Sequence, residues 1–133
     1  MHRITKLFED YPFAHRQPNH DGHCKLIHGH NWDFEVCLRA EKLDDNGFVY
    51  DFGKFDWLKK HFEEMFDHTC LVNEEDEQLK TLQLLDAQDL LDLKVVKSCS
   101  CEGLAEMVYK TLENHLQSTT SPSNPRNLQI SYI

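Results

Sequence analysis

The stretch between residues 30 and 41 constrains the fold of this chain more than any other part of the sequence. Apolar residues alternate there with polar ones. One predicted face carries His30, Trp32, Phe34, Val36, Leu38 and Ala40, and the other carries Asn31, Asp33, Glu35, Cys37, Arg39 and Glu41. This period of two predicts a β-strand with one buried and one wet face, which is typical of an antiparallel sheet. Cys37 falls on the predicted polar face, and we interpret it as structural or inert.

Histidines are concentrated before and at the start of this strand. Five of the nine lie between residues 13 and 30. His28 and His30 are two residues apart, so on a strand both imidazoles point to the same face. His15 would return to them through a loop, which the turn-forming residues 18–22 favour. Three neutral imidazoles with an open fourth position are typical of a catalytic zinc site, so we predict Zn²⁺ bound by these three residues.

Cys24 stands shortly before the histidine pair, and its role has three alternatives. It is a fourth, structural metal ligand, a nucleophile or base beside the metal, or a small buried hydrophobe. His23 and Lys25 flank it, and nearby positive charge lowers the pKa of a thiol toward the reactive range. These polar neighbours argue against burial, so we favour the reactive role.

Length and composition limit the classes of protein to consider. The 133 residues, 40% of them hydrophobic, predict a single domain over residues 1–133. The net charge of −9 disfavours a nucleic-acid partner, which needs clustered Lys and Arg. We expect no signal peptide and no membrane span, because the sequence has no apolar stretch of the required length. Five cysteines are then expected to be free thiols in a reducing cytoplasm.

The remaining segments predict an α+β fold. The expected strands cover residues 3–15, 30–41, 48–52, 93–96 and 128–133, with an Asn-Gly hairpin turn at residues 44–47. The expected helices cover residues 54–66, 73–92 and 100–116, the last with Ser100 as its N-cap. A loop is expected at residues 117–126.

Asp67 and His68 are adjacent residues just past the first expected helix. They could serve as ordinary capping and turn residues. Alternatively, the carboxylate could orient the imidazole, which would then transfer protons near neutral pH. The sequence alone leaves both interpretations open.

Taken together and in order, these motifs resemble the 6-pyruvoyltetrahydropterin synthase / 6-carboxytetrahydropterin synthase family over about residues 4–116. The motifs are Phe13-Ala14-His15, Cys24-x-x-x-His28-Gly29-His30-Asn31, Gly47-Phe48-Val49-Tyr50-Asp51-Phe52, Asp67-His68-x-x-Leu71 and Ser100-Cys101-Glu102-x-Leu104-Ala105. The three-residue gap between Cys24 and His28 resembles the bacterial 6-carboxytetrahydropterin synthases of the queuosine pathway. The animal 6-pyruvoyl enzymes carry a longer gap.

The resemblance implies a role for each matched residue. His15, His28 and His30 would bind zinc, and Cys24 would be the catalytic thiolate. Asp67 and His68 would complete a proton-transfer set, and Glu102 would help to hold the pterin. A second pterin-anchoring glutamate follows the last strand in the family, and none matches it within these 133 residues. We therefore expect pterin binding to depend on Glu102.

The resemblance also implies the fold, the reaction and the assembly. The expected fold is the tunnelling fold, an antiparallel four-stranded sheet with helices packed on one face. The expected activity is that of a zinc-dependent lyase that converts 7,8-dihydroneopterin triphosphate to 6-carboxytetrahydropterin, acetaldehyde and triphosphate. The alternatives are 6-pyruvoyltetrahydropterin synthase, which eliminates triphosphate, and a non-catalytic zinc- or pterin-binding relative. The family forms homo-oligomers, and by resemblance we expect a hexamer with sites between subunits.

Overall fold

The computed structural model describes residues 1–120 and 126–133. Residue contacts divide the chain into two compact units. The first unit comprises Met1–Glu9, Asp33–Lys60 and Ala105–Ile133, and the second comprises Asp10–Trp32 and His61–Leu104. The predicted metal ligands all belong to the second unit.

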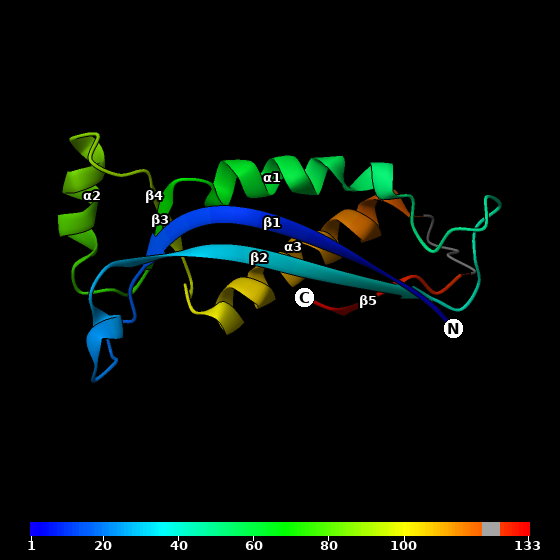
Figure 1. The fold of residues 1–133 in the computed structure, drawn as a ribbon, viewed down its shortest axis with the longest axis horizontal. Coiled ribbons are helices and arrows are strands. Elements are labelled where there is room, and N and C mark those ends of the chain that lie inside the picture. The colour runs from blue at the N-terminus through cyan, green and yellow to red at the C-terminus, as the bar shows by residue number, and fades with distance from the viewer. Residues whose placement is uncertain (121–125) are drawn as a thin grey trace. The chain divides into compact units, whose positions relative to one another are not determined.

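The strands form one five-stranded mixed sheet with the order β4-β3-β1-β2-β5 (Figure 1). The strands are β1 (His2–His15), β2 (His28–Ala40), β3 (Thr69–Asn73), β4 (Leu93–Val96) and β5 (Gln129–Tyr132). β3 pairs in parallel with both β1 and β4, whereas β2 and β5 pair antiparallel. The expectation of four antiparallel strands was therefore wrong. The expectation that the helices pack on one face of the sheet stays a prediction.

The strand that the sequence analysis missed is β3. Its first four residues are all buried, so it shows no alternation of apolar and polar positions. A continuous buried run is what a parallel strand covered on both faces requires, and it is easily mistaken for the end of the preceding helix. The chain passes through helix α2 (Leu79–Ala87) between β3 and β4, as a parallel connection requires.

In the first unit, the predicted return strand at residues 48–52 does not form. The Asp44 carboxylate accepts hydrogen bonds from the backbone N–H groups of Asn46 and Phe48, and Asp51 accepts one from Gly53. These side chains satisfy donors that a strand ladder would otherwise use. The predicted turn is present, with Gly47 at a φ of 81°. A short 3-10 helix, η2 (Phe52–Phe55), follows.

Cys37 was expected on the polar face of β2, but it is buried. The pairing of β2 with β5 shifts register between Cys37 and Leu38. The extra residue at this shift, Ser131, lies on β5, so β2 itself keeps its regular alternation of side chains. Three consecutive side chains, Val36, Cys37 and Leu38, are nevertheless buried, so both faces of β2 are covered at this point.

In the second unit, aromatic contacts pack helix α1 (Asp56–Phe66) against β1. Tyr11 meets Phe62 edge-on with ring centroids 5.9 Å apart, and Phe13 stacks on Phe66 at 5.2 Å. Edge-to-face and offset-stacked pairs are favourable arrangements for buried rings. They hold the end of β1, and therefore His15, against a rigid helix.

The expected helix at residues 73–92 was too long, because α2 covers only Leu79–Ala87. Asn73 still belongs to β3, and the turn after it is stabilised by Asp76, whose carboxylate accepts the Gln78 N–H. At the other end Asp89 has a φ of 58°, and the Leu90 N–H bonds to the Leu85 carbonyl. A left-handed residue with such a bond ends a helix.

Helix α3 (Cys101–Thr119) begins where the sequence predicts. The Ser100 hydroxyl accepts the N–H of Gly103, which confirms it as the N-cap. The helix continues three residues beyond the predicted end into the expected loop, and residues 121–125 of that loop lie outside the described residues. Among the residues that are described, no helix has the length and apolar character needed to cross a bilayer.

Candidate metal centre

The three predicted metal ligands lie together in the second unit. His15 ends β1 and is 5% exposed, while His28 and His30 begin β2. One ring nitrogen from each lies within 4.8 Å of the others. The ring centroids of His15 and His28 are 4.7 Å apart, and those of His28 and His30 are 4.9 Å apart. Three imidazoles at this spacing match the protein ligands of a catalytic zinc site.

Hydrogen bonds to the backbone orient two of these imidazoles. His15 Nδ1 lies 2.7 Å from the Cys99 carbonyl oxygen, and His28 Nδ1 lies 2.7 Å from that of Leu26. A carbonyl oxygen can only accept, so each Nδ1 carries the proton and each Nε2 keeps its lone pair. This is the usual outer arrangement of a metal-bound histidine. The donor set and its supporting bonds therefore fit a zinc ion.

Burial favours the neutral form of His15. Burial lowers the pKa of His15, the bond to the Cys99 carbonyl partly offsets this effect, and neighbouring His28 and His30 lower the pKa further. Trp32 meets the His15 ring edge-on at 4.9 Å and stacks on Phe13 at 4.4 Å. The buried side of the centre is therefore apolar, and a neutral imidazole is the form that binds a metal.

One of the three histidines, His30, is accessible to solvent. A shallow hollow of about 570 Å³ lies beside it. The hollow is lined by Pro12, Phe13, Ala14, Gly29, His30 and Asn31. Of the three histidines, only His30 lines this hollow.

Cys24 lies in a short 3-10 turn, η1 (His23–Lys25), and is half-buried. Its carbonyl accepts the Gln17 N–H at 2.8 Å, which ties together the loop between β1 and β2. The cluster of possible ligand atoms in the described residues contains the three histidines and no cysteine. This geometry does not favour Cys24 as a fourth ligand, and its reactive role stays a prediction.

Asp67 and His68 form a pair in the turn between α1 and β3. His68 Nδ1 lies 2.7 Å from Asp67 Oδ1, and both side chains are exposed. His68 has a φ of 58°, and its backbone N–H bonds to the Pro12 carbonyl at 2.8 Å. The turn interpretation and the orienting interaction are thus both present.

The other predicted contacts with substrate lie in less enclosed positions. Glu102 is exposed in the first turn of α3. Lys25 is exposed, whereas Arg16 forms an ion pair with the buried carboxylate of Asp76 at 2.7 Å. The Arg16 guanidinium is therefore already engaged in an ion pair.

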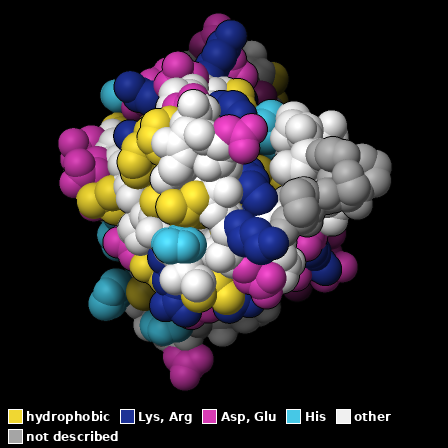
Figure 2. Space-filling model, turned by 90° about the vertical axis from the view of Figure 1, so that its right-hand side faces the viewer, with side chains coloured by type: hydrophobic (Ala, Val, Ile, Leu, Met, Phe, Trp, Pro, Cys, Tyr) yellow, Lys and Arg dark blue, Asp and Glu magenta, His cyan; other side chains and the backbone are white. Residues whose placement is uncertain are grey.

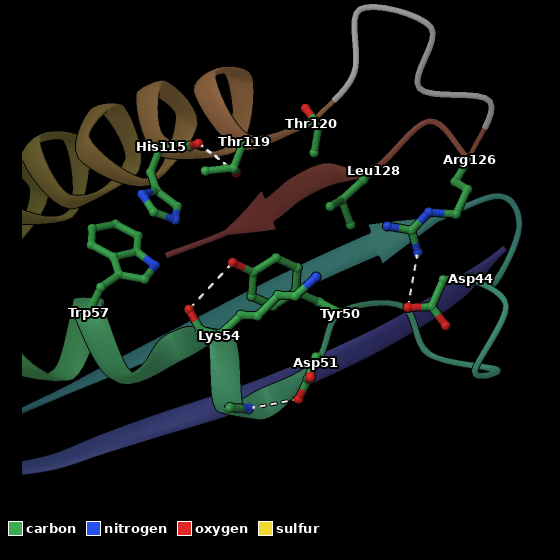
Figure 3. Close-up of a pocket in the computed structure, with 11 residues that line it drawn as sticks. Asp44, Tyr50, Asp51, Lys54, Trp57, His115, Thr119, Thr120, Arg126 and Leu128 are labelled. Carbon is green, nitrogen blue, oxygen red and sulfur yellow. Dashed lines mark hydrogen bonds and ion pairs between the residues drawn. The ribbon is translucent and has the colours of Figure 1, made fainter.

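A larger cavity, of about 600 Å³, lies in the first unit and contains none of the predicted site residues (Figure 3). Trp57 and His115 stack there at 3.8 Å, and the side chains of Lys54 and Arg126 also line it. On the face of the molecule in Figure 2, Lys and Arg side chains lie among acidic and hydrophobic ones. Among the residues that the structure describes, the histidine cluster, and not this cavity, offers a set of metal ligands.

Comparison with known proteins agrees with this geometry. A family profile described as 6-pyruvoyl tetrahydropterin synthase matches residues 3–131. The chain belongs to this family. A relative from Rickettsia conorii named 6-carboxy-5,6,7,8-tetrahydropterin synthase is 34% identical over 80 residues, which are 59% of this chain and 57% of that relative. A protein from Archaeoglobus fulgidus, provisionally given the same name, is 39% identical over 111 residues, covering 84% and 88% of the two chains.

Solved structures of the family share the fold. The structure of 6-pyruvoyl tetrahydropterin synthase from Plasmodium falciparum matches with a TM-score of 0.61 and 17% identity, over 98% of this chain and 99% of that one. An uncharacterised protein from Wolinella succinogenes matches with a TM-score of 0.79 and 18% identity, over 98% of each chain. These likenesses support the tunnelling fold expected from the sequence.

Two residues at the metal centre were not found from the sequence. Cys99 contributes its backbone carbonyl to His15, and Asn73 bonds to the backbone of Cys99. Such contacts depend on main-chain positions that are 84 and 26 residues apart in the sequence. A local motif carries no signal for either of them.

Proposed function

We propose that this protein is a zinc-dependent carbon–carbon lyase that converts 7,8-dihydroneopterin triphosphate and one water to 6-carboxytetrahydropterin, acetaldehyde and triphosphate. The proposal includes a place in 7-deazaguanine (queuosine) biosynthesis. The observation that carries it is the three-histidine cluster, in which two rings donate Nδ1–H to backbone carbonyls and keep Nε2 for a metal. The names of the relatives support the reaction, although the Rickettsia alignment spans only 57% of its relative.

Each group of predicted site residues has a separate proposed role in the reaction. Zinc bound by His15, His28 and His30 would act as a Lewis acid that lowers the barrier to removing a proton from the substrate side chain. Cys24, as a thiolate, accepts that proton. Asp67 holds Nδ1 of His68, so that Nε2 of this ring exchanges a proton with a substrate oxygen.

Glu102 is the proposed anchor for the pterin ring. A pterin presents adjacent N–H donors, and a carboxylate accepts such donors in strong, charge-assisted hydrogen bonds. Glu102 is exposed in this chain, so its carboxylate is accessible to a ligand. Lys25 is the proposed contact for the triphosphate.

We further propose that the 133 residues act as one domain and assemble as a homo-oligomer, a hexamer by resemblance, in the cytoplasm. Exposed apolar side chains next to the histidine pair support the assembly. Leu26 is 61% exposed and Ile27 is 49% exposed. Covering them with a second copy would remove apolar surface from water beside the metal centre. All five cysteines are free, which suits a reducing compartment.

The test is product analysis with purified protein, zinc and 7,8-dihydroneopterin triphosphate. The proposal expects acetaldehyde and 6-carboxytetrahydropterin in equal amounts, and a 6-pyruvoyl product without acetaldehyde would establish the rival reaction instead. The His28→Ala variant should lose both activity and zinc by elemental analysis. His20→Ala is the matched control, because His20 lies in the same loop region but outside the ligand cluster. Full zinc retention in His28→Ala would overturn the metal assignment.

A further inference from the structure

The turn between β3 and α2 contacts two separate segments that support His15. Asn73 ends β3, and its side-chain oxygen accepts the backbone N–H of Cys99 at 2.8 Å. The carbonyl of the same Cys99 accepts the Nδ1–H of His15 at 2.7 Å. One peptide segment therefore connects the Asn73 amide to the metal-binding ring.

A second connection runs from the same turn to the residue after His15. The Asp76 side chain is fully buried and binds the Arg16 guanidinium through both carboxylate oxygens, at 2.7 and 3.1 Å. The Arg16 carbonyl in turn lies 3.3 Å from Cys99 Sγ, which donates to it. Asp76 also bonds through its backbone N–H to the Asn73 carbonyl at 3.0 Å. The network closes on itself around Cys99, which is completely buried.

We infer that Asn73 is a positioning residue for the metal centre, which it serves by fixing the Cys99 carbonyl that orients His15. The inference rests on the proposed zinc site and assigns a role to the start of the segment at residues 73–92. Outer hydrogen bonds of this kind fix the tautomer and direction of a ligand imidazole, and losing one typically lowers metal affinity about 10- to 100-fold. The acceptor for His15 is a backbone carbonyl, which a substitution cannot remove. The Asn73 side chain that holds this backbone is the part of the contact that a substitution can change.

The sheet pairing explains why Asn73 can reach Cys99. Asn73 pairs with Val96 at the ends of the parallel strands β3 and β4, and the chain continues from Val96 toward Cys99. A side chain at the carboxyl end of β3 therefore lies beside the loop that leaves β4. Asn73 thereby satisfies the backbone N–H of Cys99, a residue that is completely buried.

The test compares Asn73→Ala with wild type and two controls. Asn73→Asp keeps an oxygen acceptor at the same reach and should restore the contact. Asn114→Ala removes an exposed asparagine from α3 and should change nothing. Zinc affinity is measured by competition with a chromophoric chelator, and we expect a dissociation constant about 10- to 100-fold higher in Asn73→Ala. The values for Asn73→Asp and Asn114→Ala should stay within about threefold of wild type.

A second measurement needs neither zinc nor activity. Nitrogen-15 NMR of the metal-free protein reports which nitrogen of His15 carries the proton. Wild type should show the Nδ1–H tautomer, and Asn73→Ala should show a mixture. If Asn73→Ala does not fold, Asn73→Ser takes its place, because the shorter hydroxyl cannot span the same distance.

The outcomes separate this inference from the proposed function. An unchanged tautomer and unchanged zinc affinity in a folded Asn73→Ala or Asn73→Ser variant would overturn the positioning role. An equal loss in Asn73→Asp would overturn it as well, because the acceptor is still present there. A changed tautomer in a chain that binds no zinc at all would support the contact while overturning the metal site.

Discussion

At the scale of single residues, substitution of Cys24 distinguishes a reactive thiol from a metal ligand. Cys24 is half-buried beside the exposed residues of the β1–β2 loop and stands outside the ligand cluster. We predict that Cys24→Ala keeps its zinc and its melting temperature while turnover falls by about 10²- to 10⁴-fold, the usual contribution of a general base. Cys101→Ala, which removes an exposed thiol, is the control. Loss of zinc from Cys24→Ala would instead identify Cys24 as a ligand.

His15 predicts how the metal-free protein responds to acid. Burial lowers the pKa of this imidazole in the folded state below its value of about 6.5 in the unfolded chain. The unfolded state therefore takes up the proton first as the pH falls, and the contribution of neutral His15 to stability is complete above about pH 6.5 and declines below it. We expect the free energy of unfolding of chelator-treated wild type to fall more, between about pH 7.5 and 5.5, than that of His15→Gln. Parallel curves would contradict the prediction.

The shared face of His28 and His30 could be predicted from the sequence because a period of two on a strand is a local property. The same is true of Ser100 as N-cap, since its partner is only three residues away. Asn73 and Cys99 could not be predicted, because their contacts depend on which strands become neighbours. The burial of Cys37 was mispredicted for a similar reason, since both faces of β2 are covered there by parts of the chain that are distant in the sequence.

At the scale of secondary-structure elements, the start of α3 allows a prediction at Gly103. A Cβ added at Gly103 would collide with the side chain of Ser98 and lie 2.6 Å from its backbone oxygen. Alanine at an ordinary helix position stabilises by about 1 kcal/mol relative to glycine. Overpacking of this kind costs about 1–3 kcal/mol or more, so the collision should outweigh the gain in propensity.

We therefore expect Gly103→Ala to lower the free energy of unfolding by urea titration. Gly29→Ala is the control, because a Cβ there meets its nearest atom, the Phe13 carbonyl oxygen, at an ordinary 3.9 Å. Stabilisation by Gly103→Ala would show that the Ser98 loop moves aside readily.

The elements differ in how well the sequence predicts them. The amphipathic helices and the alternating strand were found because each has a periodic apolar face. β3 was missed because its first four residues are all buried. The return strand was wrongly expected because Asp44 and Asp51 satisfy nearby backbone donors with their own carboxylates. Hydrogen bonds from backbone N–H groups to nearby carboxylates compete with hydrogen bonds between strands. The outcome is difficult to predict from the sequence when the partner strand is unknown.

At the scale of the whole molecule, the exposed apolar pair beside the metal centre predicts self-association. Replacing Leu26 and Ile27 with serine removes two exposed hydrophobic side chains from this surface. We expect the double variant to form smaller species than wild type by light scattering coupled to size exclusion, with zinc content unchanged. Leu90→Ser is the control, because Leu90 is 68% exposed near the end of α2. Equal masses for all three proteins would contradict a role of this surface in assembly.

The sheet order was also beyond the reach of the sequence pattern. Strand pairing is a long-range choice, and the mixed arrangement depends on β3 and β4 pairing in parallel across the connection that contains α2. The family resemblance gave the general fold, but it did not show the added parallel strands. Only the structure reveals that the first residues of the segment 73–92 lie next to the loop that supports His15.

Because Cys99 is buried, the rate at which its thiol is alkylated would report how often the candidate metal centre opens. Burial raises the pKa of the Cys99 thiol, and an alkylating reagent can reach it only when the surrounding network opens. Cys101, two residues away, is exposed, so its alkylation rate gives the rate for an accessible thiol on the same chain. If zinc binds only the closed form, the labelling rate of Cys99 at a given free zinc concentration is lower than the zinc-free rate by the factor 1 + [Zn²⁺]/Kd. The labelling rate of Cys101 should stay unchanged. The ratio of two labelling rates within one peptide would then measure occupancy of a metal that is itself spectroscopically silent.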